Sequence, residues 1–145
     1  MLGGMTGGKA MSATSSEEKS NLDVVRRGYE AFQAGNAEEL MKTMAPNAHY
    51  HLAPIGKFGG DYKGVKAIME FFGEIARESG GTFRVTPVEM AAAGNRVFVL
   101  YGASGKHGGK TLDSRDVAVF TLAGGRVTDA MFCASDYPAE AAFWS

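Results

Sequence analysis

The order of elements predicted between residues 21 and 54 constrains the fold of this chain more than any other feature. Apolar residues recur there at helical spacing up to Gly35, a residue that can adopt the left-handed conformation that ends a helix. Asn36 can cap a second short helix, with Glu39 completing a capping box, and Pro54 ends a short strand that begins near His49. Two helices that lead through a tight corner into a strand are typical of the start of an α+β domain.

Four successive strands are predicted after a third helix at residues 65–78. Beyond residue 82 the apolar period changes to two, and glycine-containing turns separate the segments, as in an antiparallel meander. The predicted strands lie at residues 82–92, 96–104, 110–122 and 126–135. A change of apolar phase across Pro87 predicts a bulge in the first of them, and Asp136 can cap a closing helical turn.

We therefore expect a strongly curved mixed sheet wrapped around helices, which is a cone-shaped α+β barrel. The strand near residues 49–53 should join the meander, with helices 17–34 and 65–78 on the concave face, while the glycine-rich stretch 56–64 should be a loop. Residues 1–19 read as a flexible tail and residues 20–145 as one domain.

Composition excludes several classes of protein. The 15 basic and 16 acidic residues give a net charge of −1 without a basic stripe, so we expect no nucleic-acid partner. The start of the chain lacks the apolar core of a secretory signal, and no apolar run is long enough to cross a membrane. Together with the single cysteine, Cys133, these features predict a cytoplasmic protein.

The pattern resembles the SnoaL-like branch of the nuclear-transport-factor-like superfamily, which includes ketosteroid isomerase, limonene epoxide hydrolase and scytalone dehydratase. The resemblance covers about residues 20–145. It rests on the Ala-Gly-Asn corner at residues 34–36, the strand ending in Pro54, the glycine-rich loop and the Gly-Gly-Arg-Val-Thr hairpin at residues 124–128. It implies an enclosed pocket for a small apolar ligand, whose lining decides the function.

Most catalytic residues of those relatives do not carry over to this chain. The oxyanion-hole tyrosine and catalytic aspartate of ketosteroid isomerase fall on Gly28 and Leu52, and its second oxyanion-hole acid falls on Ala118. The epoxide hydrolases share Tyr50, but the acid of their last strand falls on Phe132. The resemblance therefore argues against steroid isomerisation by the known mechanism.

Asp116 is the acid that the resemblance places nearest the pocket. If Ala118 faces the cavity, strand alternation points Ser114, Asp116 and Phe120 the same way. A carboxyl group in an apolar pocket has a raised pKa and can act as a general acid or base. The alternative is a carboxylate at the rim, paired with a lysine or arginine, since a slip of one residue reverses the strand.

We predict Tyr50 or His51 as the catalytic partner of Asp116, because the neighbours of His51 match cavity-lining positions of the family. His49 and His51 share a strand face and offer two imidazoles, but no third metal ligand is evident, so we predict neither a metal nor a cofactor. The predicted ligand-binding residues are Tyr29, Phe32, Leu52, Phe72, Ser114, Ala118, Phe120, Phe132 and Trp144.

Two functions remain open at this point. One is a cofactor-independent isomerase, cyclase, dehydratase or hydrolase that acts by acid–base chemistry on an apolar cyclic or polyketide-like metabolite. The other is a non-catalytic ligand-binding or dimerisation module of the same fold. In either case Val117, Val119 and Met131 on the reverse face predict a homodimer through the convex side of the sheet.

Overall fold

The first helix, α2 (Ser16–Ala34), begins at a capping box in the computed structural model, which describes residues 14–145. The Glu18 N–H donates to Ser15 Oγ at 3.1 Å, and the Ser15 N–H donates to Glu18 Oε1 at 2.8 Å. This cap extends the helix into the predicted tail, so residues 16–19 are helical rather than flexible. The rest of the predicted tail, residues 1–13, lies outside the described residues.

Glycine and asparagine form the predicted corner between the first two helices. Gly35 has a φ of 68° and ends α2, while the Asn36 side chain accepts a hydrogen bond from the Glu39 N–H at 3.2 Å and starts α3 (Ala37–Lys42). Only half of the predicted capping box forms, because the Glu39 carboxylate pairs with Lys42 instead. The corner itself is confirmed.

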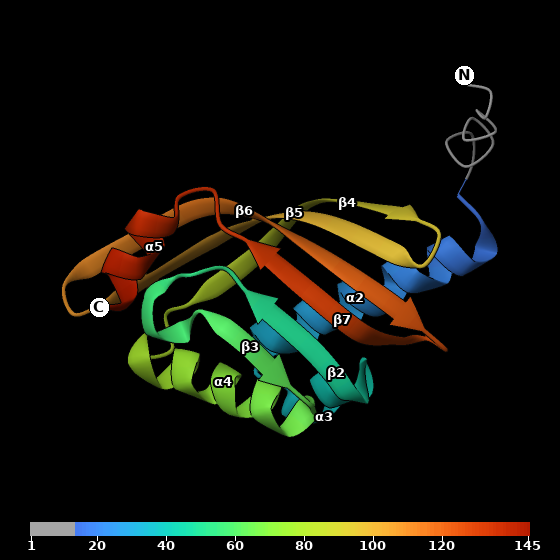
Figure 1. Cartoon of the computed structure of the whole chain (residues 1–145), viewed down its shortest axis with the longest axis horizontal. Coiled ribbons are helices and arrows are strands. Elements are labelled where there is room, and N and C mark those ends of the chain that lie inside the picture. Colours follow the sequence, from blue (N-terminus) through green and yellow to red (C-terminus); the bar gives the residue numbers. More distant parts are fainter. Residues whose placement is uncertain (1–13) are drawn as a thin grey trace, which may run out of the picture.

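The sheet has six strands in the order β3-β2-β7-β6-β5-β4 (Figure 1). Strands β2 and β7 are parallel, and every other neighbouring pair is antiparallel. The strands are β2 (Met44–Leu52), β3 (Gly60–Lys63), β4 (Arg84–Ala93), β5 (Arg96–His107), β6 (Lys110–Ala123) and β7 (Arg126–Cys133). The mixed curved sheet and its four-stranded meander are confirmed, and the register shift between Pro87 and Glu89 confirms the predicted bulge.

One strand was missed. The stretch predicted as a loop contains a short 3₁₀ turn, η1 (Gly56–Phe58), and then β3, which pairs with β2 so that Tyr62 lies opposite Tyr50. Four residues are too few to show strand periodicity, and this edge strand forms because β2 offers it unpaired backbone groups. Strand β2 is also longer than predicted and begins at Met44, with an irregular stretch around Pro46.

The helices pack on the side of the sheet where the core lies. Helix α2 contacts β4 and β5, α4 (Val65–Glu78) contacts β2 and β3, and α5 (Tyr137–Trp144) contacts β6 and η1. Figure 1 shows α5 at the opposite end of the molecule from the start of α2. In residues 14–145 no helix has the length and apolarity that a membrane span requires. The cytoplasmic location stays a prediction.

The outer face of the sheet carries a row of partly exposed apolar side chains. Phe98, Val119 and Met131 are cross-strand neighbours on β5, β6 and β7, and Phe98 and Met131 are 40% and 46% exposed. A contiguous apolar row on one face is a feature of surfaces that associate with another protein. The predicted homodimer through this face stays a prediction.

We expect light scattering to give the mass of a dimer at tens of micromolar protein, and the double variant Phe98→Lys/Met131→Lys to give a monomer with an unchanged circular dichroism spectrum. The physical reason is that two lysines per chain would have to lose their hydration in the interface. A wild-type monomer at this concentration would contradict the prediction.

Candidate functional site

A cavity of about 130 Å³ lies between the helices and the concave face of the sheet. Most of its wall is apolar or aromatic, contributed by α2, α4, α5 and five strands of the sheet. Of the predicted site residues, the structure places these in the wall: Tyr29, Phe32, Tyr50, Leu52, Phe72, Asp116, Phe120, Phe132 and Trp144. The structure thus confirms the prediction that Asp116 and Phe120 on β6 face the cavity.

Two predicted ligand-binding residues do not reach the cavity. Ala118 is fully buried on the inner face of β6, but its methyl group is short, and the rings of Phe120 and Phe132 pack beside it. Ser114 is half-buried outside the cavity wall and makes hydrogen bonds to two carboxyl groups. Its contribution to the site is therefore made through those carboxyl groups.

The polar end of the cavity is a pair of buried carboxyl groups. Asp116 on β6 is 3% exposed, and Glu140 on α5 is 5% exposed. The hydroxyl of Ser114 lies 3.4 Å from Asp116 Oδ2 and 3.4 Å from Glu140 Oε2, so it can donate to either. Asp116 Oδ1 accepts hydrogen bonds from the Ser135 N–H at 3.0 Å and the Ser135 hydroxyl at 3.3 Å. These donors stabilise a negative charge on Asp116.

Glu140 is the member of the pair that holds a proton. Burial, followed by the hydrogen bond to Asp116 and the charge of Asp116, raises the pKa of Glu140 to about 8. Two carboxyl groups this close in an apolar site cannot both ionise without a large cost in free energy. Near neutral pH Glu140 is therefore held as a carboxylic acid beside Asp116.

Three tyrosines supply further polar groups of the cavity wall. Tyr101 lies directly opposite Asp116 in the β5–β6 ladder, and burial together with the charge of Asp116 raises its pKa. Burial also raises the pKa of Tyr29 and of Tyr50, so all three phenols are neutral hydrogen-bond donors rather than bases. Within the described residues, the buried hydroxyl of Tyr29 has no hydrogen-bond partner and is free to bind a ligand.

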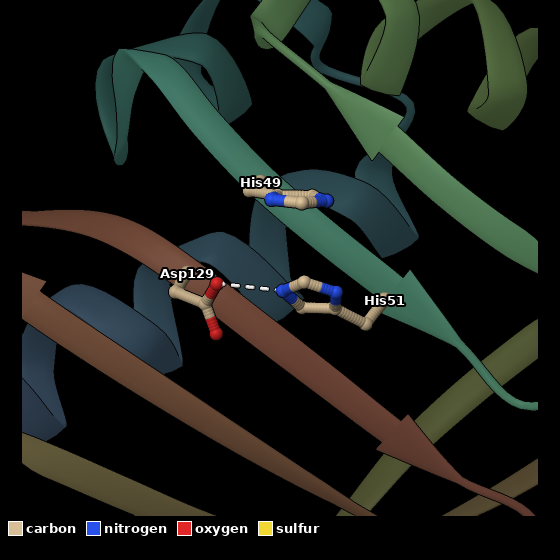
Figure 2. Close-up of side chains that lie close together, drawn as sticks. All are labelled: His49, His51 and Asp129. Atoms are coloured by element: carbon tan, nitrogen blue, oxygen red, sulfur yellow. Dashed lines mark hydrogen bonds and ion pairs between the residues drawn. The ribbon is translucent and has the colours of Figure 1, made fainter.

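The structure corrects the prediction for His51. Because side chains alternate along β2 and Tyr50 faces the cavity, His51 faces the opposite side of the sheet. Its ring binds two carboxylates there. Nε2 lies 2.8 Å from Asp129 Oδ1 (Figure 2). Nδ1 lies 3.1 Å from Asp61 Oδ1. His51 therefore cannot carry protons for Asp116 inside the pocket.

Sequence reasoning missed Glu140 and Tyr101. Glu140 is the single acid in an otherwise apolar closing helix, and this pattern could have marked it as a buried functional group. The docking of that helix could not be read from the pattern. His107 Nδ1 donates to the Phe143 carbonyl at 2.8 Å and Lys110 Nζ donates to the Ser145 carbonyl at 2.7 Å, which ties the end of α5 to β5 and β6.

A curved mixed sheet with an apolar pocket on its concave side places this chain in the class of α+β folds that bind small molecules. The sequence pattern of the SnoaL-like domain matches residues 25–130, and the chain belongs to this family. The resemblance identified from the sequence is thereby confirmed.

The relatives of the chain agree with this assignment. The uncharacterized protein Rv0034 of Mycobacterium tuberculosis is 30% identical over 129 residues, which cover 88% of this chain and 98% of that protein. The structure of Bal32a, from a soil-derived mobile gene cassette, is 34% identical and covers 90% of this chain and 100% of that one, with a TM-score of 0.87.

A second similar structure belongs to a candidate SnoaL-like polyketide cyclase from Jannaschia sp. CCS1. It is 19% identical, covers 92% of this chain and 98% of its own, and has a TM-score of 0.77. At this identity the likeness is one of fold.

The raised pKa of Glu140 predicts how stability depends on pH. Between the ordinary carboxyl value of 4.5 and about 8, the folded chain binds a proton at Glu140 that the unfolded chain releases. The free energy of unfolding should therefore fall by a few kcal/mol as pH rises through this window. Each unit of pKa difference between the folded and the unfolded chain is worth about 1.4 kcal/mol.

Glu140→Gln should remove this dependence, because the amide resembles the protonated acid and does not ionise. Urea denaturation at about pH 5 and about pH 9 measures the effect, with the exposed Glu89→Gln as the matched control. If the free energy of unfolding of Glu140→Gln fell between these two pH values as much as that of the wild type, another group would bind the proton.

Proposed function

We propose that this protein is a cofactor-independent enzyme that binds a small apolar cyclic metabolite and moves protons on it. The observation that carries the proposal is the buried pair of Asp116 and Glu140 at the polar end of an apolar cavity. A pair that holds one proton offers a base and an acid in the same site, which is what isomerases, cyclases and dehydratases of carbonyl compounds need.

The two carboxyl groups would have different roles. The Asp116 carboxylate would remove a proton from a carbon next to a carbonyl group of the ligand, while Glu140 would donate its proton to the oxygen on which negative charge develops. Tyr101, across the ladder from Asp116, is positioned to donate a hydrogen bond to the same oxygen. Tyr50 was predicted as the partner of Asp116, but its ring packs against Phe72 and Phe132, which suits it to orient the ligand.

The size of the cavity supports a compact ligand. An engineered apolar cavity of about 150 Å³ holds a benzene molecule, so a cavity of about 130 Å³ suits a ligand with one small ring. A larger metabolite would have to displace side chains of the wall. The candidate polyketide cyclase of Jannaschia has the same fold, which supports a cyclic or polyketide-like substrate as the class to test first.

A specific observation also supports the non-catalytic alternative, a ligand-binding module. By the resemblance to ketosteroid isomerase and epoxide hydrolase, Leu52 and Phe132 stand where those enzymes carry polar catalytic groups, and both line the cavity here. A pocket can bind an apolar ligand without using its carboxyl pair. The two experiments that follow separate binding from catalysis.

Binding can be measured through Trp144, the single tryptophan of the chain, which is 1% exposed and lines the cavity. We expect cyclopentanone, a small cyclic ketone, to change the fluorescence of Trp144 in a saturable way. Ala103→Leu should abolish this change, since Ala103 lines the cavity and the larger side chain fills it. The control Ala123→Leu, at an exposed position, should behave like the wild type. Equal binding by Ala103→Leu would place the ligand elsewhere.

Catalysis can be measured as exchange of the α-hydrogens of cyclopentanone for deuterium, followed by NMR. We expect Asp116→Asn to slow the catalysed exchange at least about 100-fold while ligand binding persists, because the amide keeps the shape of the carboxylate and loses its basicity. Asp113→Asn, on the exposed face of the same strand, is the control. Binding without enhanced exchange in the wild type, across cyclopentanone and related cyclic ketones, would favour the binding module.

A further inference from the structure

Three metal-ligating side chains meet on the convex face of the sheet, on the side away from the pocket (Figure 2). His49 and His51 alternate onto this face of β2, and Asp129 lies opposite His49 in the parallel ladder with β7. One potential ligand atom from each of the three lies within 4.8 Å of the other two. The pair of imidazoles seen in the sequence thus has a third ligand, 78 residues further along the chain from His51.

His51 is held by carboxylates at both ring nitrogens. Its Nε2 lies 2.8 Å from Asp129 Oδ1, and its Nδ1 lies 3.1 Å from Asp61 Oδ1 on the neighbouring strand β3. A histidine that binds a metal through one nitrogen commonly donates its other N–H to a carboxylate, which fixes the ring and its tautomer. Asp61 is in place to do this for a metal shared by His51 and Asp129.

His49 has a nitrogen that the surrounding protein leaves unsatisfied. Its Nε2 is buried and has no hydrogen-bond partner within residues 14–145, and the nearest carboxylate oxygen, Asp61 Oδ2, is 3.8 Å away. The ring stands 3.9 Å from that of His51, measured between centroids. A buried polar atom without a partner calls for an explanation, and a bound ion is one of the standard explanations.

We propose that His49, His51 and Asp129 bind one divalent transition-metal ion, of which Zn²⁺ is the best match, with Asp61 orienting His51. Two imidazoles and a carboxylate suit Zn²⁺ in ligand type, and the carboxylates of Asp129 and Asp61 balance its charge. Ligand atoms of a tetrahedral zinc site lie about 3.4 Å apart, so small side-chain rotations bring the three groups together. The fourth position would take water or an external ligand.

The test uses untagged protein, because the chain itself has only three histidines and a histidine tag would add others. Isothermal titration with Zn²⁺ should give one ion per chain with a dissociation constant of micromolar or below. His49→Gln, His51→Gln and Asp129→Asn should each weaken binding at least tenfold, and Asp61→Asn should weaken it by about 10 to 100-fold. Asp113→Asn, an exposed carboxylate on the same face of the sheet, is the matched control and should bind like the wild type.

Two further measurements keep the result clear if a variant folds poorly. Co²⁺ added to the wild type should give the visible absorption of tetrahedral cobalt, and the Cys133→Ser variant should give the same spectrum, since Cys133 lines the pocket on the other side of the sheet. Binding of cyclopentanone, read from Trp144, should be unchanged by Asp129→Asn. Absence of the cobalt spectrum in the wild type, or zinc binding of equal strength in folded His49→Gln and His51→Gln, would overturn the proposal.

Discussion

The parallel pairing of β2 with β7 is the constraint on which the rest of the structure depends. It joins the helix–helix–strand unit at the start of the described chain to the meander that follows, and its register fixes the side of the sheet on which each side chain lies. Tyr50 and Leu52 thereby face the helices together with Phe132, while His49 and His51 face outward beside Asp129. One ladder therefore positions both the pocket wall and the histidine cluster.

The carboxyl pair shows how the fold tolerates buried acids. Asp116 and Glu140 come from β6 and from the closing helix α5, and neither has an arginine or lysine among its hydrogen-bond partners in residues 14–145. The proton held by Glu140 lowers the cost of burying both carboxyl groups, and the two Ser135 donors satisfy Asp116 Oδ1.

The two candidate sites are separated by the thickness of the sheet. Side chains on opposite faces of one strand can be substituted independently. A substitution among the proposed metal ligands therefore leaves the pocket wall in place, and the reverse also holds. Membership of the SnoaL-like family accounts for the fold, while chemistry in any such fold depends on a few side chains placed in it. That is why Asp116, Glu140 and Tyr101 define the proposed activity better than overall similarity does.

The sequence by itself determined the local structure. The periodicity of α2, the glycine corner at Gly35 and the bulge at Pro87 depend on residues close together in the chain, and all three were predicted. The direction of Asp116 toward the cavity also followed from strand alternation, once the resemblance had assigned Ala118 to the inner face of the sheet.

Only the tertiary structure decided which distant residues meet. β3 forms because a neighbouring strand offers it hydrogen bonds, Glu140 reaches Asp116 because α5 docks against β6, and Asp129 reaches His51 because β7 lies beside β2. The face occupied by His51 was also misjudged, since a single strand shows which residues alternate but not which set faces the core. Contacts between segments far apart in the chain depend on packing and register, which local sequence patterns do not encode.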